Sequence, residues 1–303
     1  MSDRVLISLD GGVADVRFNR PDKRNALDGE QFLAIAEAGE RLKTEPGVRA
    51  VVLSGEGASF CAGLDFSSFQ AIADAGEQLK SDAELRAVVI AGRGKSFCAG
   101  LDLAMFERFD RATEAGNPGI IQPSGQTHLG QQVAWVWQEL PVPVIAAVHG
   151  HALGGGLQIA LGADIRIVHP DTKLSVREVH WGLVPDMTGT FFLSRLVRPD
   201  VAKELTFTAR IIDGREAVAL GLATRLSENP VADAMTLATD IATRSPDAVR
   251  GAKRLFNRLA NGGAAEQFAE ERDEITAIVG TPNQVEAVVA SVENRPARFA
   301  IRR

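Results

Sequence analysis

A seven-residue segment, Ser-Phe-Cys-Ala-Gly-Leu-Asp, occurs twice in this chain, at residues 59–65 and again at 96–102. The repetition extends backwards: with an offset of 37, residues 32–69 match residues 69–106 at 23 of 38 positions. Each copy holds a helix-like stretch, a valine-rich stretch and a glycine-containing loop. A solenoid needs three or more repeats, so two copies predict a local duplication inside a larger fold. The loop is typical of an active site, and a site needs only one.

Composition limits the kinds of protein this chain can be. With 303 residues it can bury a sizeable core, in one large domain or two smaller ones. A net charge of −6 gives no support to a nucleic-acid-binding protein, and no apolar run reaches the 18 residues of a membrane span. Cys61 and Cys98 occupy the same position in the two copies, which fits small buried thiols in a reduced, cytoplasmic setting better than a disulfide.

Periodic patterns predict an α/β fold. Alternating apolar residues on both sides of Asp10-Gly11-Gly12 predict a β-hairpin over residues 5–9 and 13–18. Nearly continuous apolar runs predict parallel strands buried on both faces, at residues 48–53, 85–90 and 144–148. Helical patterns precede them at residues 28–43, 71–80 and 131–140. We therefore predict a core over residues 1–205 that contains the duplicated unit, and a helical C-terminal region over residues 206–303.

Two stretches carry candidate chemistry. The strand at 144–148 leads into Gly154, Gly155 and Gly156, which open a helix. Free N–H donors and the dipole at such a helix start favour developing negative charge, with tight helix packing as the open alternative. Glu178 and Asp186 lie among apolar residues. A carboxylate in those surroundings can exchange protons near neutrality, although most such carboxylates are solvated or salt-bridged.

In combination these motifs resemble the crotonase superfamily, the enoyl-CoA hydratase and isomerase family, over nearly the whole chain. The matching segments are NRPDKRNAL, VRAVVLSGEGASFCAGLDF with its copy LRAVVIAGRGKSFCAGLDL, the glycine-rich stretch, REVHWGLVPD, FTARIIDGREAVALGLA and ENRPARF. Without one copy the chain has 303 − 37 = 266 residues, the usual size for that family. The resemblance implies a ββα-spiral core that binds an acyl-CoA thioester, then a helical trimerisation region that builds a homotrimer or hexamer.

The resemblance also implies an oxyanion hole made of two backbone N–H groups. One belongs to the middle glycine, Gly155. The other follows the Ala-Gly of the loop and is that of Leu101 or Leu64; we expect Leu101, because the second copy continues directly into the rest of the core. Expected contacts to CoA or the acyl group are Arg24, Ala26, Cys98, Ala99, Gly100, Asp102, Leu103, Gly154, Gln158 and Trp181.

The acid and base positions decide the reaction. Family hydratases use two glutamates, and the matching positions here are Gln158 and Glu178. Family dienoyl-CoA isomerases add an aspartate that matches Asp186, whereas simple enoyl-CoA isomerases need mainly the second glutamate. Because Gln158 cannot exchange a proton at neutral pH, the expected activity is enoyl-CoA or dienoyl-CoA isomerisation by Glu178 and Asp186. A hydratase and a non-catalytic CoA-binding or scaffold protein remain as alternatives, and the acyl group is left open.

Other residues are given lesser roles. No grouping of His, Cys and carboxylates has metal-ligand spacing, and no cofactor is expected beyond the CoA of the substrate. His149 and His151 are expected to be structural rather than to touch substrate. Lys253 is expected to be a solvated surface lysine, with the CoA phosphates of a neighbouring subunit as the alternative.

Overall fold

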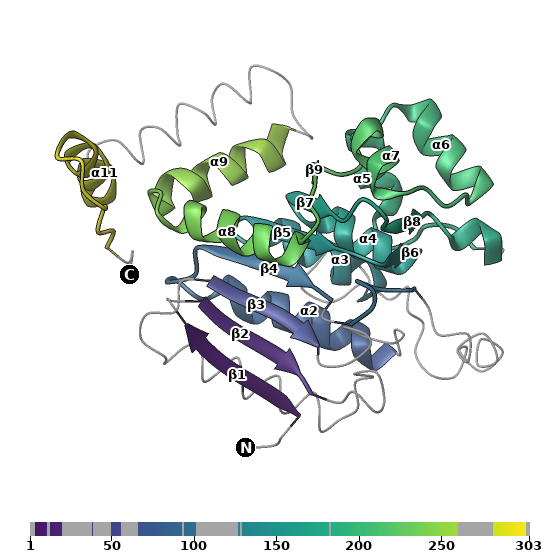
Figure 1. Cartoon of the computed structure of the whole chain (residues 1–303), viewed down its shortest axis with the longest axis horizontal. Coiled ribbons are helices and arrows are strands. Elements are labelled where there is room, and N and C mark those ends of the chain that lie inside the picture. The colour runs from purple at the N-terminus through teal and green to yellow at the C-terminus, as the bar shows by residue number, and fades with distance from the viewer. Residues whose placement is uncertain are drawn as a thin grey trace.

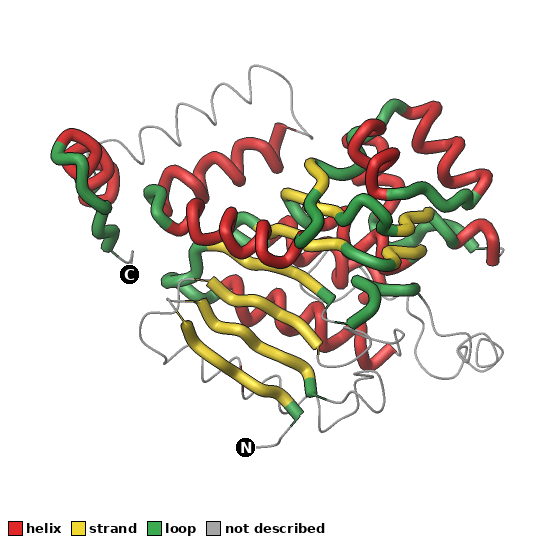
Figure 2. Tube along the Cα trace, viewed as in Figure 1, coloured by secondary structure: helices red, strands yellow, loops and turns green. Residues whose placement is uncertain are grey.

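The computed structural model describes residues 4–10, 13–19, 38, 50–55, 66–92, 94–100, 127, 129–181, 183–259 and 281–300 (Figures 1 and 2). Its strands are β1 (Val5–Asp10), β2 (Val13–Phe18), β3 (Ala50–Gly55), β4 (Ala87–Ala91), β5 (Val144–Val148), β6 (His151–Leu153), β7 (Ile165–Val168), β8 (Lys173–Ser175) and β9 (Arg225–Leu226). Its helices are α2 (Phe66–Lys80), α3 (Leu129–Glu139), α4 (Gly155–Gly162), α5 (Gly189–Leu196), α6 (Pro199–Thr208), α7 (Gly214–Leu220), α8 (Pro230–Ala242), α9 (Pro246–Leu259) and α11 (Pro282–Val292), with a 3₁₀ turn, η3 (Glu178–Trp181).

A seven-stranded sheet organises the chain in the order β1-β2-β3-β4-β5-β7-β9. The β1–β2 hairpin is antiparallel, as the alternating pattern predicts, and every later pairing in this sheet is parallel. The carboxyl ends of the parallel strands therefore lie along one edge, where ligands bind in open α/β sheets. A second sheet of two parallel strands, β6 and β8, lies beside that edge.

The duplicated strands lie next to each other and pair in the register of the repeat. Ala50 pairs with Ala87 and Leu53 with Ile90, so the four paired residues of β3 each face the residue 37 positions later, which is the one that aligns with it in the repeat. The outer neighbours differ, because β3 pairs with β2 on one side and β4 pairs with β5 on the other. The duplication has therefore added one strand to the middle of the sheet without changing its register.

The sheet is buried on both faces, as the apolar runs predict. Val88, Ile90 and Ala146 point into one core with helices α2, α3 and α4. Their neighbours Val89 and Ile145 point into a second core, which Ala234 and Ala238 of α8 close. Figure 1 shows α8 crossing the strands on one side of the sheet, with α2 and α3 on the other. This two-sided burial holds the carboxyl ends of β4 and β5 rigidly in place.

Helices in the second half of the chain begin at residues that favour helix starts. Asp213 caps α7 by accepting a hydrogen bond from the Glu216 N–H, and Asn229 caps α8 in the same way. Proline occupies the first position of α8 and of α9, where its missing N–H costs no helical hydrogen bond. Within the described ranges, no helix has both the length and the apolar character that crossing a bilayer requires.

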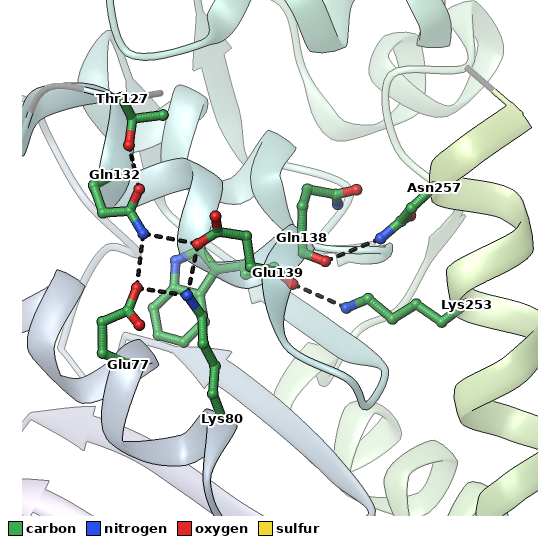
Figure 3. Close-up of polar contacts among 9 residues, drawn as sticks. Glu77, Lys80, Thr127, Gln132, Gln138, Glu139, Lys253 and Asn257 are labelled. Carbon is green, nitrogen blue, oxygen red and sulfur yellow. Dashed lines mark hydrogen bonds and ion pairs between the residues drawn. The ribbon is translucent and has the colours of Figure 1, made fainter. Parts of the chain in front are cut away.

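Polar contacts, exposed at Lys80 and buried at Lys253, join helices that are far apart in the chain (Figure 3). Lys80 of α2 lies 2.5 Å from Glu77 Oε1 and 2.7 Å from Glu139 Oε2 of α3. Lys253 of α9 donates to the backbone carbonyls of Trp137 and Val142, and its Nζ lies 2.7 Å from Asp164 Oδ2. Only 8% of Lys253 is exposed, so the prediction that it is a solvated surface lysine is wrong. Lys253 anchors α9 to the core, because its three ammonium donors all find acceptors there.

Removing one repeat unit is expected to leave a folded protein. Deleting residues 51–87 joins Ala50 to Val88 and fuses β3 with β4. The fused strand keeps the pairing with β2 on one side and with β5 on the other, because residues paired between β3 and β4 are separated by the same number of positions as the two repeat copies. The first-copy residues Glu40 and Lys43 then take the sequence positions of Glu77 and Lys80. We expect a cooperative melt with a Tm within about 10 °C of the parent, a difference of a few kcal/mol, measured by circular dichroism.

A deletion that is one residue longer serves as the matched control. Removing residues 51–88 shifts the fused strand by one position, and a shift of one exchanges the two faces of a strand. This variant is expected to be insoluble or unfolded. If both deletions unfold the chain to the same extent, the duplicated unit is not separable from the sheet.

Candidate active site

The glycine turn between β6 and α4 forms one wall of the candidate site. Gly154 has a φ of +53° and donates its N–H to the Ser175 carbonyl at 2.9 Å. A Cβ at Gly154 would be strained by that φ and would lie 3.2 Å from Glu178 Oε1. Gly155 begins α4, where backbone donors lack acceptors within the helix, and no described residue accepts a hydrogen bond from its N–H. The turn therefore brings a free donor close to Glu178.

The second copy of the repeated loop lies directly against this turn. Cys98 donates its N–H to the His151 carbonyl at 2.9 Å and accepts from the Leu153 N–H at 3.1 Å. A Cβ on Gly156 would lie 2.4 Å from the Cys98 carbonyl oxygen, so only glycine permits this approach. Gly100 has a φ of +97° and is buried, whereas Ala99 is exposed. Loop and turn are thus held together by backbone hydrogen bonds on both sides of Cys98.

The two candidate histidines support this loop. His149 Nε2 donates to the Gly94 carbonyl at 2.7 Å, and His151 Nδ1 is hydrogen-bonded to Ser96 Oγ at 2.9 Å. Both contacts join the end of β5 and the start of β6 to the segment that leads into the second loop. The expected structural role of these histidines is the one that the geometry supports.

Glu178 is the buried carboxylate of the site. It begins η3, is 8% exposed, and its Oε2 is buried without a hydrogen-bond partner in the described part of the chain. Burial raises the pKa of Glu178 because the ionised form is poorly solvated, and the negative charge of Asp186 adds to the rise. A carboxylate with a free oxygen and a raised pKa is suited to take up and return a proton.

Gln158 belongs to α4, and its side chain lies beside that of Glu178. Its side chain is 2% exposed, and Nε2 donates to Glu178 Oε1 at 2.5 Å. Its Oε1 accepts from the N–H groups of Met187 and Gly189, each at 2.9 Å. Sequence reasoning did not identify these two backbone donors. The signal available was the sequence Thr188-Gly189, where Thr188 adopts a φ of +70° and α5 begins.

Of the remaining candidate residues, the structure describes Asp186 and Trp181. Asp186 is exposed, and its charge acts on Glu178. Trp181 is 47% exposed and stands edge-on to His180, with ring centroids 4.9 Å apart. Leu101 and its alternative Leu64, together with Arg24, Ala26, Asp102 and Leu103, lie outside the described residues. The structure therefore brings together Gly154, Gly155, Gln158, Glu178 and the Cys98–Gly100 part of the second loop.

A cavity of about 590 Å³ lies at the other end of α4, but it does not contain these residues. Its walls come from the end of α4 and from α3, α5, α8 and α9, including Leu161, Phe256 and Lys253. The buried ammonium of Lys253 is fully hydrogen-bonded there. The other ionisable side chains of its walls are also engaged: Glu139 and Asp164 pair with Lys80 and Lys253, Arg166 donates to backbone carbonyls, and Arg195 lies over the Phe191 ring. The candidate active site is therefore the pair formed by Glu178 and the glycine turn.

Comparison with known proteins identifies the family and the fold of the chain. The family model described as enoyl-CoA hydratase/isomerase matches residues 8–75 and again 69–302. The two matches overlap inside the duplicated unit. The fold superposes on the crystal structure of an enoyl-CoA hydratase from Polaromonas sp. JS666 with a TM-score of 0.74, covering 98% of this chain and 99% of that chain at 22% identity.

Relatives of similar length carry related names. A short-chain-enoyl-CoA hydratase of Clostridium acetobutylicum is 35% identical over 97% of this chain and 96% of that protein. A crotonyl-CoA hydratase of Syntrophomonas wolfei is 28% identical over 98% of both. Both names describe hydratases, so they give no support to the expected preference for isomerisation. The family match, the fold and these relatives together show that the chain belongs to the enoyl-CoA hydratase/isomerase family.

Proposed function

We propose that this protein moves a carbon–carbon double bond in an enoyl-CoA thioester, with Glu178 as its acid and base. The observation that supports the proposal is that the site pairs one ionisable side chain, Glu178, with one amide side chain, Gln158. Glu178 keeps a buried oxygen without a partner, while both functional ends of Gln158 are occupied by hydrogen bonds. Water addition needs one group to activate water and another to protonate the α-carbon, whereas isomerisation needs one group that does both steps in turn.

The proposed reaction balances without a cofactor. Glu178 Oε2 takes a proton from C2 of a 3-enoyl thioester, and the electron pair of the broken C–H bond delocalises onto the thioester oxygen. The same carboxyl group then returns the proton to C4, and the double bond moves to C2–C3. No group is oxidised or reduced, and CoA remains bound to the acyl group throughout.

Two backbone donors are proposed to hold the enolate oxygen. One is the Gly155 N–H at the start of α4, and the other is the N–H of Leu101, the residue after Gly100. The hydrogen bonds that fix Cys98 against β6 support the second copy over Leu64. Each such donor typically contributes about 2.7–4 kcal/mol to the transition state. In this proposal Arg24, Ala26, Ala99, Asp102 and Leu103 contact the CoA moiety, and Trp181 lines the acyl-binding side.

Hydration is the second candidate, because the relatives of similar length are called hydratases. In that reaction Glu178 would act on a water molecule and Gln158 would orient it.

A third candidate reaction is dienoyl-CoA isomerisation, in which Asp186 returns the proton that Glu178 removes. The exposure of Asp186 and its electrostatic effect on Glu178 are compatible with that role.

Two substrates separate isomerisation from hydration. We expect the protein to convert 3-hexenoyl-CoA to 2-hexenoyl-CoA faster than it hydrates crotonyl-CoA, both followed by ultraviolet absorbance. Replacing Gln158 with glutamate supplies the missing second carboxylate, so hydration should rise by about tenfold or more, within the range expected for one positioned acid or base. Fast hydration that Gln158→Glu does not improve would defeat the isomerase proposal.

We also propose that the protein acts as a homotrimer or hexamer. Large apolar side chains stand exposed on three separate helices: Phe207 on α6 is 70% exposed, Phe256 on α9 is 74% exposed and Val288 on α11 is 52% exposed. Exposed apolar surface of this kind is typical of subunit interfaces.

A further inference from the structure

The amide of Gln158 has only one orientation that satisfies its surroundings. Two backbone N–H groups, those of Met187 and Gly189, point at one end of the amide. Since both are donors, that end must be the carbonyl oxygen. The amino group then necessarily faces Glu178, 2.5 Å from Oε1. The donor to Glu178 is thus determined by the two backbone groups on the other side of Gln158.

The backbone around residues 187–189 fits closely around this amide. Thr188 adopts a left-handed φ of +70°, which costs a β-branched residue energy. At Gly189 a Cβ would lie 2.6 Å from Gln158 Oε1, so any other residue would push the amide away. The strained threonine and the glycine together place two N–H groups at a single side-chain oxygen.

Gln158 makes the two oxygens of Glu178 unequal. Oε1 accepts the amide N–H, while Oε2 is buried without a partner among the described residues. The hydrogen bond at Oε1 opposes rotation of the carboxylate, because exchanging the two oxygens would break it. In the proposed reaction, the transferred proton is therefore carried by Oε2 of Glu178.

Few charges act on this pair. Asp186 is the negative charge that acts on Glu178, and the guanidinium of the adjacent Arg177 donates to the Ala209 carbonyl. Helix α4 carries no ionisable side chain, and on α5 the guanidinium of Arg195 lies over the Phe191 ring. On α6, Asp200 pairs with Arg198, Glu204 pairs with Arg210, and Lys203 is exposed. On η3, the ionisable residues are Glu178 itself and His180.

We propose that Gln158 is a positioning residue: it fixes Glu178 through Oε1, so that Oε2 alone exchanges the proton, and it does not itself act as an acid or base. This inference rests on the proposed function, because it assigns Gln158 a role in the chemistry of Glu178. The amide N–H also stabilises the ionised carboxylate and so opposes the rise that burial causes in the pKa of Glu178.

Replacing Gln158 with methionine tests the role. Methionine has a similar length and flexibility but donates no hydrogen bond to Glu178. The ionised form of Glu178 loses a stabilising partner, so its pKa should rise further. Because the ionised carboxylate is the base, activity is lost as pH falls through that pKa, and the acidic limb of the kcat profile should move up by about one pH unit. At pH 7 kcat should fall about tenfold or more, with little change in KM.

Gln138→Met provides the matched control. Gln138 of α3 is a partly buried glutamine, and its amide donates to the Gly162 carbonyl at 2.7 Å rather than to Glu178. Both variants lose hydrogen bonds and should melt at lower temperature, but only Gln158→Met should move the acidic limb. A carbon-13 NMR titration of the glutamate carboxyl groups checks the same shift without turnover.

The outcomes separate this inference from the proposed function. If Glu178→Gln removes activity while Gln158→Met lowers only the melting temperature and leaves the acidic limb in place, Gln158 is merely structural and the inference is overturned. If Glu178→Gln retains full activity, the proposed function itself fails. A shifted limb in Gln158→Met, together with an unshifted limb in Gln138→Met, supports the positioning role.

Discussion

Replacing Glu178 with glutamine is expected to lower kcat for double-bond isomerisation by about 10²- to 10⁴-fold, the usual contribution of one acid–base group. Glutamine has the same shape and can still accept the Gln158 amide N–H, but its amide cannot take a proton. CoA binding should be unchanged, because the proposed contacts to CoA lie elsewhere. Isomerisation assays and calorimetric titration with CoA check the two parts separately. Retention of full activity would remove Glu178 from its proposed role.

The same variant should change how stability depends on pH. The folded-state pKa of Glu178 is raised, mainly by burial, so folding is progressively opposed as pH rises from the unfolded pKa, about 4.3, to the folded one. Above the folded pKa the loss is complete. The Glu178→Gln variant has no ionisable group at this position, so its free energy of unfolding does not fall for this reason. The free energy of unfolding of the variant relative to the parent should therefore increase with pH across that window and then level off, as measured by urea denaturation.

Replacing Leu101 with proline is expected to lower kcat by about 10²- to 10³-fold, because proline removes one proposed oxyanion donor. Leu64→Pro, the same change in the first copy, should leave kcat within about twofold of the parent, since one donor is expected to be used and the other copy supplies it. The second copy continues directly into the rest of the core, and the hydrogen bonds of Cys98 with His151 and Leu153 add support for choosing it. Steady-state isomerisation kinetics on both variants decide between them.

Alanine at the same two positions controls for side-chain and backbone effects. Leu101→Ala keeps the N–H, so it should retain most of the activity that Leu101→Pro loses. Leu64→Ala should behave like Leu64→Pro. Inactivation by Leu64→Pro alone would mean that the first copy supplies the donor and that the choice of Leu101 is wrong.

Much of the sheet could be predicted from the sequence because it is buried on both faces. The run at residues 144–148 coincides with β5, and the hairpin pattern coincides with β1 and β2 apart from one residue. β4 begins two residues later than predicted. Strand boundaries depend on which backbone groups meet a partner, and an apolar run by itself does not reveal that.

The short elements of the site were not predictable in the same way. β6 and β8 have three residues each, and η3 has four, so none shows a periodic pattern. β6 and β8 exist because Cys98, Gly150 and Ile212 offer backbone partners from other parts of the chain. The error at Lys253 has a similar cause. A lysine in an amphipathic helix is normally solvated, and only the three-dimensional structure reveals the carbonyls and Asp164 that accept its donors.

The sequence by itself determined the family, the duplicated unit, the glycine turn and the presence of Gln158 where a second glutamate would stand, because each of these is a local pattern of residue types. The tertiary structure decided which strands the two copies pair with, that the second loop lies against Gly156, and that Gln158 faces Glu178 with its donor. Those outcomes depend on contacts between residues 20 to 60 positions apart, and they follow from strand register and backbone hydrogen bonding.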